Sequence, residues 1–280
     1  MAQRDLSRGL TFDDVALSYD RYRPRYPAEL FDDLGDVADL GGESRVLEVG
    51  SGPGVATEEM MARGWSVLAV DPGAQLAQIA RNKFAGARFA VEVSTFDDRD
   101  SKGRRFDVVL SATAYHWVAP EVRWTKAAQV LETGGHLALA TNEAADHGSF
   151  NDFTVATRAL RERYGVDEGD ENIVECWDSI IETAGGDIGG LWEAIGPQGT
   201  AVLAGVAFDT PDVRIYRWSK TYSTAEALGL LATYSRYLVV DPPRRGELFE
   251  RLATTIDADF AGQLERHYVT ILAMARRTGL

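Results

Sequence analysis

The sequence predicts an α/β protein built on a doubly wound, mostly parallel β-sheet. Three observations predict it. Strand-like and helix-like runs alternate over residues 45–141, the first apolar run breaks into the glycine turn VLEVGSGPG at 46–54, and the second ends at Asp71. Strands at this rhythm, separated by crossover helices, are typical of parallel sheets. A chain of 280 residues is also long enough for one large domain with a sizeable core.

The first half of the chain supplies five strands and the helices between them. Gly64 ends the first of these helices, and Gly134 and Gly135 open the fifth strand. Short apolar runs stopped by glycine or Asp-Pro indicate buried strands, and apolar residues at helical spacing indicate the crossovers. The expected strands are 45–49, 66–70, 88–93, 106–112 and 136–141, and the expected helices are 55–64, 75–84 and 121–131.

The pattern changes after residue 145. Residues 146–200 are helix-like and predict a helical insertion, after which residues 211–280 complete the sheet. In that last part we expect strands at 213–222 and 267–277 and helices at 224–238 and 244–257. No repeat or low-complexity linker divides the chain, so we interpret residues 1–280 as a single domain with 45–141 as its ligand-binding core.

Composition excludes several classes of partner. The formal net charge is −14 and the basic residues are scattered, which disfavours nucleic acid and an anionic membrane surface. The N-terminus has no apolar signal region, and the longest apolar stretch, 201–208, is too short for a bilayer, so we expect a cytoplasmic protein. One cysteine and four dispersed histidines give no metal-ligand spacing, so no metal is expected. The oligomeric state stays open, a homodimer included.

The glycine turn points to a ligand without a phosphate. Gly50, Gly52 and Gly54 are spaced as G-x-G-x-G, whereas the dinucleotide fingerprint is G-x-G-x-x-G. The turn should lie at the carboxyl end of the first strand, where open α/β sheets bind ligands. Glu48 adds negative charge behind it, which suits a zwitterion with an ammonium near the acid. A plain strand-to-helix turn is the alternative.

Asp71 strengthens the ligand interpretation. It ends the second strand, where an acid accepts hydrogen bonds from both hydroxyls of a ribose. It can also be the N-cap of a helix that has Pro72 at its first position, and both roles are compatible.

Six stretches together resemble the class I S-adenosylmethionine-dependent methyltransferases. VLEVGSGPG and SVLAVD resemble the first two motifs of that family. VEVSTFDD (91–98), FDVVLSATAYHWV (106–118) and VLETGGHLALA (130–140) resemble the segments around the next strands. YDRYRPRYP (19–27) resembles the lead-in of a subgroup that includes trans-aconitate methyltransferase-like proteins. The motifs cover about half of the chain, and residues 146–200 match nothing recognisable.

The resemblance implies a seven-stranded Rossmann-like sheet with an antiparallel C-terminal strand. It implies that residues 1–40 form a helical lid, and we expect 146–200 to act as a cap over the substrate. The implied activity is methyl transfer from S-adenosylmethionine to an oxygen, nitrogen or carbon atom of a small molecule, with S-adenosylhomocysteine as product. SATAYHW stands where methyltransferases of DNA or glutamine often carry Asn/Asp-Pro-Pro-Tyr/Phe, which disfavours those substrates.

The cofactor site that we carry over follows the motif positions. Glu48 and the Gly50 carbonyl would serve the amino-acid portion, Asp71 the ribose, and Asp97 with Phe96 the adenine. Arg23 would meet the methionyl carboxylate or else remain a solvated loop arginine. The full expected set is Tyr19, Tyr22, Arg23, Glu48, Gly50, Ser51, Gly52, Gly54, Asp71, Pro72, Phe96, Asp97, Ser111 and Ala112.

The acceptor side is expected around His116, just past the fourth strand. A histidine there can act as a general base near neutral pH, or it can only pack beside Trp117. Tyr115 is a candidate for substrate contact. Trp192 and Trp218 are candidates for the pocket wall, together with Trp177 and Tyr222, unless these aromatics form a small core of their own. Cys176 is expected to be a buried, inert thiol.

Two other functions remain as alternatives. A cyclase or another enzyme can use the same cofactor pocket without methylating anything, because fold does not fix function. An NAD-dependent dehydrogenase would share the sheet, but the glycine spacing and Glu48 argue against it.

Overall fold

A computed structural model describes residues 16–119, 121–145, 147–166, 208–209 and 211–278. Its centre is one seven-stranded sheet in the order β3-β2-β1-β4-β5-β7-β6. The strands are β1 (Arg45–Val49), β2 (Ser66–Asp71), β3 (Phe89–Val93), β4 (Phe106–Ala112), β5 (Leu131–Ala144), β6 (Asp212–Ser223) and β7 (Gln263–Arg276). Because β7 runs antiparallel to both β5 and β6, and the other neighbours are parallel, the predicted fold class is confirmed.

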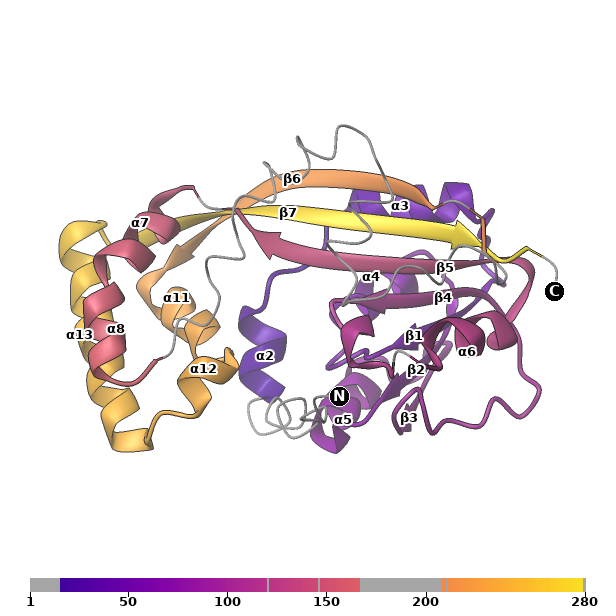
Figure 1. Cartoon of the computed structure of the whole chain (residues 1–280), viewed down its shortest axis with the longest axis horizontal. Helices are drawn as coiled ribbons and strands as arrows, with labels where there is room; N and C mark the ends of the chain where they lie inside the picture. The colour runs from indigo at the N-terminus through magenta and orange to yellow at the C-terminus, as the bar shows by residue number, and fades with distance from the viewer. Residues whose placement is uncertain (1–15, 120, 146, 167–207, 210, 279–280) are drawn as a thin grey trace.

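Helices cover both faces of the parallel part of the sheet (Figure 1). Apolar side chains of α3, α4 and β1 form a core on one face, and those of α6, β4 and β5 form a core on the other. The crossover helices lie where the apolar spacing predicts them, and each begins or ends within a few residues of the expected position. These crossover helices are α4 (Thr57–Ala62), α5 (Ala74–Lys83) and α6 (Arg123–Val130), whereas α3 (Ala28–Val37) precedes β1.

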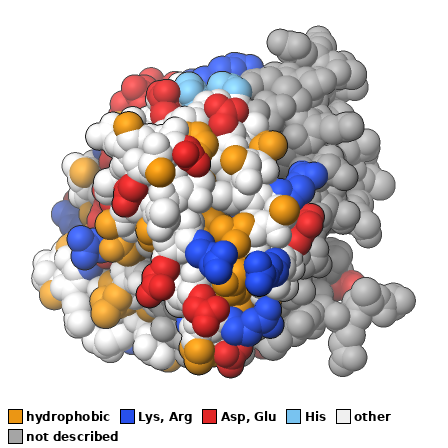
Figure 2. All heavy atoms as spheres, turned by 90° about the vertical axis from the view of Figure 1, so that its left-hand side faces the viewer, with side chains coloured by type: hydrophobic (Ala, Val, Ile, Leu, Met, Phe, Trp, Pro, Cys, Tyr) orange, Lys and Arg blue, Asp and Glu red, His pale blue; other side chains and the backbone are white. Residues whose placement is uncertain are grey.

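A helical lobe packs around the far ends of β6 and β7 (Figure 1). It combines two helices from the predicted insertion with three from the C-terminal part. Its core includes Phe150, Phe153, Tyr222, Leu252 and Tyr268. Its outer face carries acidic, basic and apolar side chains interspersed (Figure 2). The lobe helices are α7 (Ser149–Ala156), α8 (Arg158–Arg163), α11 (Thr224–Leu231), α12 (Ser235–Leu238) and α13 (Pro242–Asp259).

The predicted helix 224–238 is divided in two. Between α11 and α12, the Thr233 hydroxyl donates to the Leu230 carbonyl at 2.6 Å, which gives the backbone an alternative to continuing the helix. Trp177, Cys176, Trp192 and the rest of the predicted insertion from 167 to 200 lie outside the described residues.

Helix α2 (Ala16–Tyr22) lies between the lobe and the parallel sheet (Figure 1). It contacts α11 on one side and α5 on the other. Since α5 follows β2, this position places α2 beside the carboxyl ends of the parallel strands. No helix in the described parts of the chain is long and apolar enough to cross a membrane.

Candidate functional site

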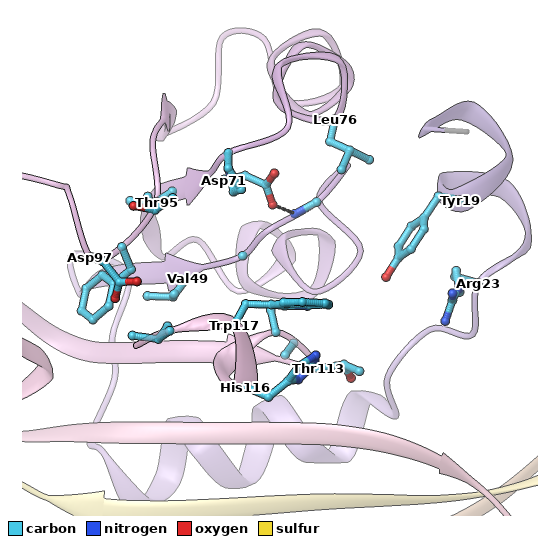
Figure 3. Close-up of a pocket in the computed structure, with 18 residues that line it drawn as sticks. Tyr19, Arg23, Val49, Asp71, Leu76, Thr95, Asp97, Thr113, His116 and Trp117 are labelled. Carbon is cyan, nitrogen blue, oxygen red and sulfur yellow. Dashed lines mark hydrogen bonds between the residues drawn. The ribbon is translucent and has the colours of Figure 1, made fainter. Parts of the chain in front are cut away.

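A cavity of about 400 Å³ lies at the carboxyl ends of β1, β2 and β4 (Figure 3). The order of strands reverses between β1 and β4, which is where doubly wound sheets bind ligands. Its volume suits a ligand the size of a nucleoside derivative. The described residues that line it are Tyr19, Arg23, Val49, Gly50, Gly52, Val70, Asp71, Pro72, Leu76, Thr95, Phe96, Asp97, Ala112, Thr113, Ala114, His116, Trp117 and Val118.

A second cavity of about 70 Å³ adjoins the first at the glycine turn. The two share Tyr19, Arg23, Gly50, Gly52 and Thr113, among other residues. The smaller one adds polar groups from four elements: Tyr26, Glu48, Ser51 and Asn142. One ligand can therefore extend from the apolar main cavity into a small polar end.

The three glycines of the turn have different roles. Gly50, Gly52 and Gly54 all have positive φ, which glycine adopts without strain. A Cβ on Gly50 would collide with Ala114, and one on Gly54 would collide with the Phe84 ring, whereas one on Gly52 would meet nothing within 4 Å. Gly54 does not line either cavity. Only Gly52 thus leaves its space open to a ligand.

Glu48 lies behind the turn with 1% of its surface exposed. One carboxylate oxygen accepts a hydrogen bond from the Thr57 hydroxyl at 2.5 Å. Burial raises the pKa of Glu48 to about 8 against the opposing effect of this bond, and the negative charge of Asp71 adds to the rise. A buried acid of this kind at the polar end of a cavity favours a cationic group on the ligand.

Asp71 points from the end of β2 toward the glycine turn (Figure 3). Its carboxylate accepts hydrogen bonds from the backbone N–H of Gly52 at 2.7 Å and of Gly73 at 2.8 Å. Helix α5 begins at Ala74, two residues after Pro72, so Pro72 is not its first residue. Asp71 orders the loop before this helix and lines the main cavity at the same time.

Asp97 and Phe96 line the opposite end of the main cavity. The Asp97 carboxylate accepts a hydrogen bond from the Ala119 N–H at 3.1 Å, and the Lys126 ammonium donates to the Asp97 carbonyl at 2.6 Å. These bonds fix the segment after β3 against the segment after β4.

Two residues of the segment predicted to form a lid, Tyr19 and Arg23, face this cavity from α2 and the residue just after it (Figure 3). The Arg23 guanidinium stacks on Tyr19 and Tyr234 and donates to the Thr233 hydroxyl and carbonyl, both at 2.9 Å. It is therefore not a solvated loop arginine, and it lines both cavities together with Gly50 and Gly52. The Tyr22 ring turns the other way and packs on Gly229, so Tyr22 does not line either cavity.

The acceptor-side candidates divide between the cavity and the core. His116 and Trp117 line the main cavity from the short helix η2 (Tyr115–Trp117). Tyr115 does not: its ring packs between Phe96 and Trp124, and its hydroxyl donates to a buried backbone carbonyl, that of Arg123, at 2.7 Å. Tyr115 therefore belongs to the core and does not reach the cavity where an acceptor would bind.

Trp218 lies on β6 and does not line either of these two cavities. Its ring stacks on Tyr268 at 4.5 Å, and its indole N–H donates to the Thr270 hydroxyl at 2.8 Å. It borders a separate cavity of about 250 Å³ between β6, β7 and the segment before α7. Tyr222 is fully buried in the core of the helical lobe, where its hydroxyl bonds that of Tyr268.

Two further predicted residues lie at the edge of the site. Ala112 lines both cavities, whereas the Ser111 hydroxyl is buried and donates to the Val49 carbonyl at 2.8 Å, tying β4 to β1.

Three residues of the small polar cavity, Tyr26, Thr113 and Asn142, were not predicted from the sequence. Tyr26 and Thr113 lie inside two of the family-like stretches and Asn142 lies outside them, but nothing in these motifs shows that the three residues meet where the ends of β4 and β5 and the segment after α2 converge.

Comparison with known proteins agrees with this geometry. Residues 46–135 match the sequence profile of a family described as a methyltransferase domain. This segment runs from β1 to the start of β5 and contains the glycine turn, Asp71, Asp97 and His116. Residues 46–135 are therefore similar to a methyltransferase domain.

Curated relatives are similar to this chain over a longer stretch of about 140 residues. An uncharacterised methyltransferase of Mycobacterium tuberculosis is 35% identical over 141 residues, which are 50% of this chain and 55% of the relative. An uncharacterised methyltransferase-like protein of Schizosaccharomyces pombe is 29% identical over 143 residues, 49% of this chain and 53% of that one. The chain thus spans about half the length of the curated relatives that it matches.

Solved structures share the fold of most of this chain. One, from Anaeromyxobacter dehalogenans, is a type II methyltransferase by its description, has a TM-score of 0.62 at 20% identity, and covers 91% of this chain and 98% of its own. A second, the phosphoethanolamine N-methyltransferase 2 of Haemonchus contortus with S-adenosylhomocysteine bound, has a TM-score of 0.50 at 14% identity. It covers 98% of this chain and 59% of its own.

Proposed function

We propose that the protein transfers a methyl group from S-adenosylmethionine to a small-molecule acceptor. The observation that carries the proposal is the excess of acidic over basic side chains around the site. Glu48, Asp71 and Asp97 contribute three carboxylates to the two adjoining cavities, and Arg23 is the single arginine or lysine among the described residues that line them. That set is poor for a pyrophosphate and good for an adenosine that carries an ammonium.

The residues present fit this cofactor in both cavities. Asp71 would accept hydrogen bonds from the ribose, and Phe96 with Asp97 would hold the adenine end, since both residues line the far end of the main cavity. Glu48 would hold the ammonium through the adjoining polar cavity, and Gly52 leaves room for the ligand chain. When bound, the cofactor supplies a methyl carbon that is already activated by a sulfonium.

The protein's own task in such a reaction is alignment. Holding two reactants in a productive geometry is worth many orders of magnitude in rate. Tyr19 and Arg23 cover the cavity from the lid, and His116 with Trp117 forms the opposite wall (Figure 3). A base is needed only where the acceptor holds its proton at the working pH, and His116 is the side chain placed to take it.

A small-molecule acceptor is favoured by the size of the site. The main cavity lies between α2 and η2 and has a volume of about 400 Å³, which suits the cofactor together with a small acceptor. The phosphoethanolamine methyltransferase with the same fold also acts on a small molecule, as its name states. Oxygen, nitrogen and carbon acceptors are all compatible with these walls.

Calorimetric titration with S-adenosylhomocysteine and with NAD tests the cofactor. We expect micromolar binding of the first and none of the second, and the reverse result would replace the methyltransferase with a dehydrogenase. Incubation with S-adenosylmethionine labelled in the methyl group, against a panel of small hydroxyl, amine and carbon acids, tests the reaction. Product that forms without label would favour a cyclase or a related non-methylating enzyme.

A further inference from the structure

Thr113 has a strained backbone at the edge of the site. Its φ is +55°, a region that β-branched residues rarely adopt. It follows β4 directly and precedes Ala114 and the helix η2 with His116 and Trp117. Residues in such conformations persist only where the surrounding structure holds them, and they concentrate at functional sites. The glycine turn across the cavity uses glycine for the same kind of backbone, so the threonine here calls for another explanation.

The side chain of Thr113 supplies that explanation. Its hydroxyl forms a hydrogen bond of 2.7 Å with the Tyr26 hydroxyl, and it also accepts a long one, 3.4 Å, from the Asn142 N–H. The Thr113 backbone N–H donates to the Ala140 carbonyl at 2.7 Å. Glycine would relieve the strain but would lose both bonds of the side chain.

Asn142 holds the same segment at the neighbouring residue. Its side-chain amide donates to the Arg25 carbonyl at 3.1 Å and accepts from the Thr270 hydroxyl at 2.5 Å. The chain after α2 is therefore fastened at two successive residues, Arg25 and Tyr26, to the ends of β4 and β5. Tyr26 lies three residues after Arg23, which lines both cavities.

We infer that Tyr26 and Thr113 are positioning residues, whose hydroxyl pair holds the lid and the loop of His116 in one arrangement around the cofactor. The inference rests on the proposed function. Tyr26 and Thr113 both line the small polar cavity together with Glu48, so the pair lies between the two walls that it joins. Loss of the pair would let the lid and the loop move independently, and binding would then have to order both.

A merely structural bond would behave differently, and the chain contains a matched example. The Tyr216 hydroxyl donates to the Asp33 carboxylate at 2.5 Å and ties β6 to α3. Neither residue lines the two cavities. Tyr216→Phe therefore removes a comparable hydroxyl bond without touching the site.

The experiment compares Tyr26→Phe, Thr113→Ser, Thr113→Gly and Tyr216→Phe in the full chain, with S-adenosylhomocysteine as the probe. Calorimetry gives the Kd of S-adenosylhomocysteine for each variant, and thermal unfolding gives the Tm. Hydrogen exchange measures how fast the Thr113 backbone amide exchanges with solvent in the unliganded protein. We expect Tyr26→Phe to weaken binding about tenfold and to accelerate the exchange of that amide by a similar factor. Thr113→Ser keeps the hydroxyl and should bind within about twofold of wild type.

Thr113→Gly separates positioning from stability. Relief of the positive φ should offset much of the cost of the lost bonds and of the more flexible unfolded chain, so Tm should stay near that of wild type, while binding weakens as in Tyr26→Phe. Tyr216→Phe should lower Tm without changing the Kd or the exchange of the Thr113 amide. Wild-type Kd and exchange in Tyr26→Phe, or equal losses of affinity in Tyr26→Phe and Tyr216→Phe, would overturn the inference. If wild type itself bound no S-adenosylhomocysteine, the proposed function would fail, and the exchange data would still decide whether Tyr26 anchors the loop.

Discussion

The Thr57 hydroxyl donates a hydrogen bond of 2.5 Å to the buried Glu48 carboxylate. One hydrogen-bond donor does not replace the hydration that the carboxylate loses on burial, so the pKa of Glu48 rises to about 8. The unliganded protein therefore holds Glu48 mostly protonated at pH 7. An ammonium placed beside this carboxylate would favour the ionised form, and binding of such a ligand would release a proton.

The first prediction is that S-adenosylhomocysteine binds more tightly as the pH rises toward 8 and that its affinity then levels off. Calorimetry at pH 7 in buffers of different ionisation enthalpy should show the release of about one proton per ligand. Glu48→Gln should bind weakly at every pH and release none. Glu143→Gln is the matched control, because Glu143 is also a largely buried acid with a raised pKa but does not line the two cavities. Loss of proton release in Glu143→Gln as well would contradict the assignment.

The same titration predicts how stability depends on pH. The folded-state pKa of Glu48 lies above its ordinary value of 4.5, so between 4.5 and about 8 the native protein binds a proton that the unfolded chain has lost. This group therefore makes the unliganded protein less stable as the pH rises through that window. Thermal unfolding from pH 5 to 9 should show a shallower decline of Tm in Glu48→Gln than in wild type. Parallel curves for the two proteins would mean that Glu48 does not titrate in this window.

The second prediction concerns Asp71, whose carboxylate is held by the Gly52 and Gly73 N–H groups. Asp71→Ala should weaken binding of S-adenosylhomocysteine by about 1.5–3 kcal/mol, as expected for hydrogen bonds to a charged group. Asp100→Ala is the control, since that carboxylate also accepts a backbone N–H, that of Lys102 at 2.9 Å, but lies away from the cavities. Wild-type affinity in Asp71→Ala would remove Asp71 from the cofactor site.

The sheet could be predicted from the sequence because buried parallel strands appear as continuous apolar runs. The expected 45–49 and 106–112 are the observed bounds of β1 and β4. Gly50 ends the first of these runs and Asp71-Pro72 the second, so the sequence also predicts that the glycine turn and Asp71 lie at one edge of the sheet. The edge of the site was predictable because it is built from strand ends.

The remaining features depend on contacts between distant segments. Nothing in SATAYHW shows that Tyr115 turns into the core while His116 lines the cavity, because the short helix η2 decides it. The aromatic character of Trp218 predicts a pocket wall. Its ring instead stacks on that of Tyr268, on the neighbouring strand β7. The positive φ of Thr113 is equally unreadable from sequence, since it depends on a partner 87 residues away.

The third prediction separates two glycines of the turn. Gly50→Ala should lower Tm strongly, because the new methyl group would collide with the Ala114 side chain in addition to the strain at positive φ. Gly52→Ala has open space and should cost only about 1–2 kcal/mol of backbone strain. Its methyl group would enter the ligand's space, so binding of S-adenosylhomocysteine should fall more than stability does. Wild-type affinity in Gly52→Ala, after correction for the folded fraction, would mean that Gly52 does not border the ligand.

The fourth prediction concerns the chemical role of His116, which lines the cavity wall opposite the lid (Figure 3). Once an acceptor has been found with labelled methyl donor, His116→Ala should lower turnover by about 10²–10⁴-fold if the residue takes the acceptor's proton. The Kd of S-adenosylhomocysteine should change much less. The Gln side chain of His116→Gln can still form hydrogen bonds, but it does not titrate near neutral pH. The turnover of His116→Gln should be as low as that of His116→Ala if His116 transfers the proton. It should recover if His116 only orients the acceptor. His136→Ala is the control, because that histidine lies on β5 and does not line either cavity of the site. Unchanged turnover in His116→Ala at saturating acceptor would reduce His116 to a wall of the pocket.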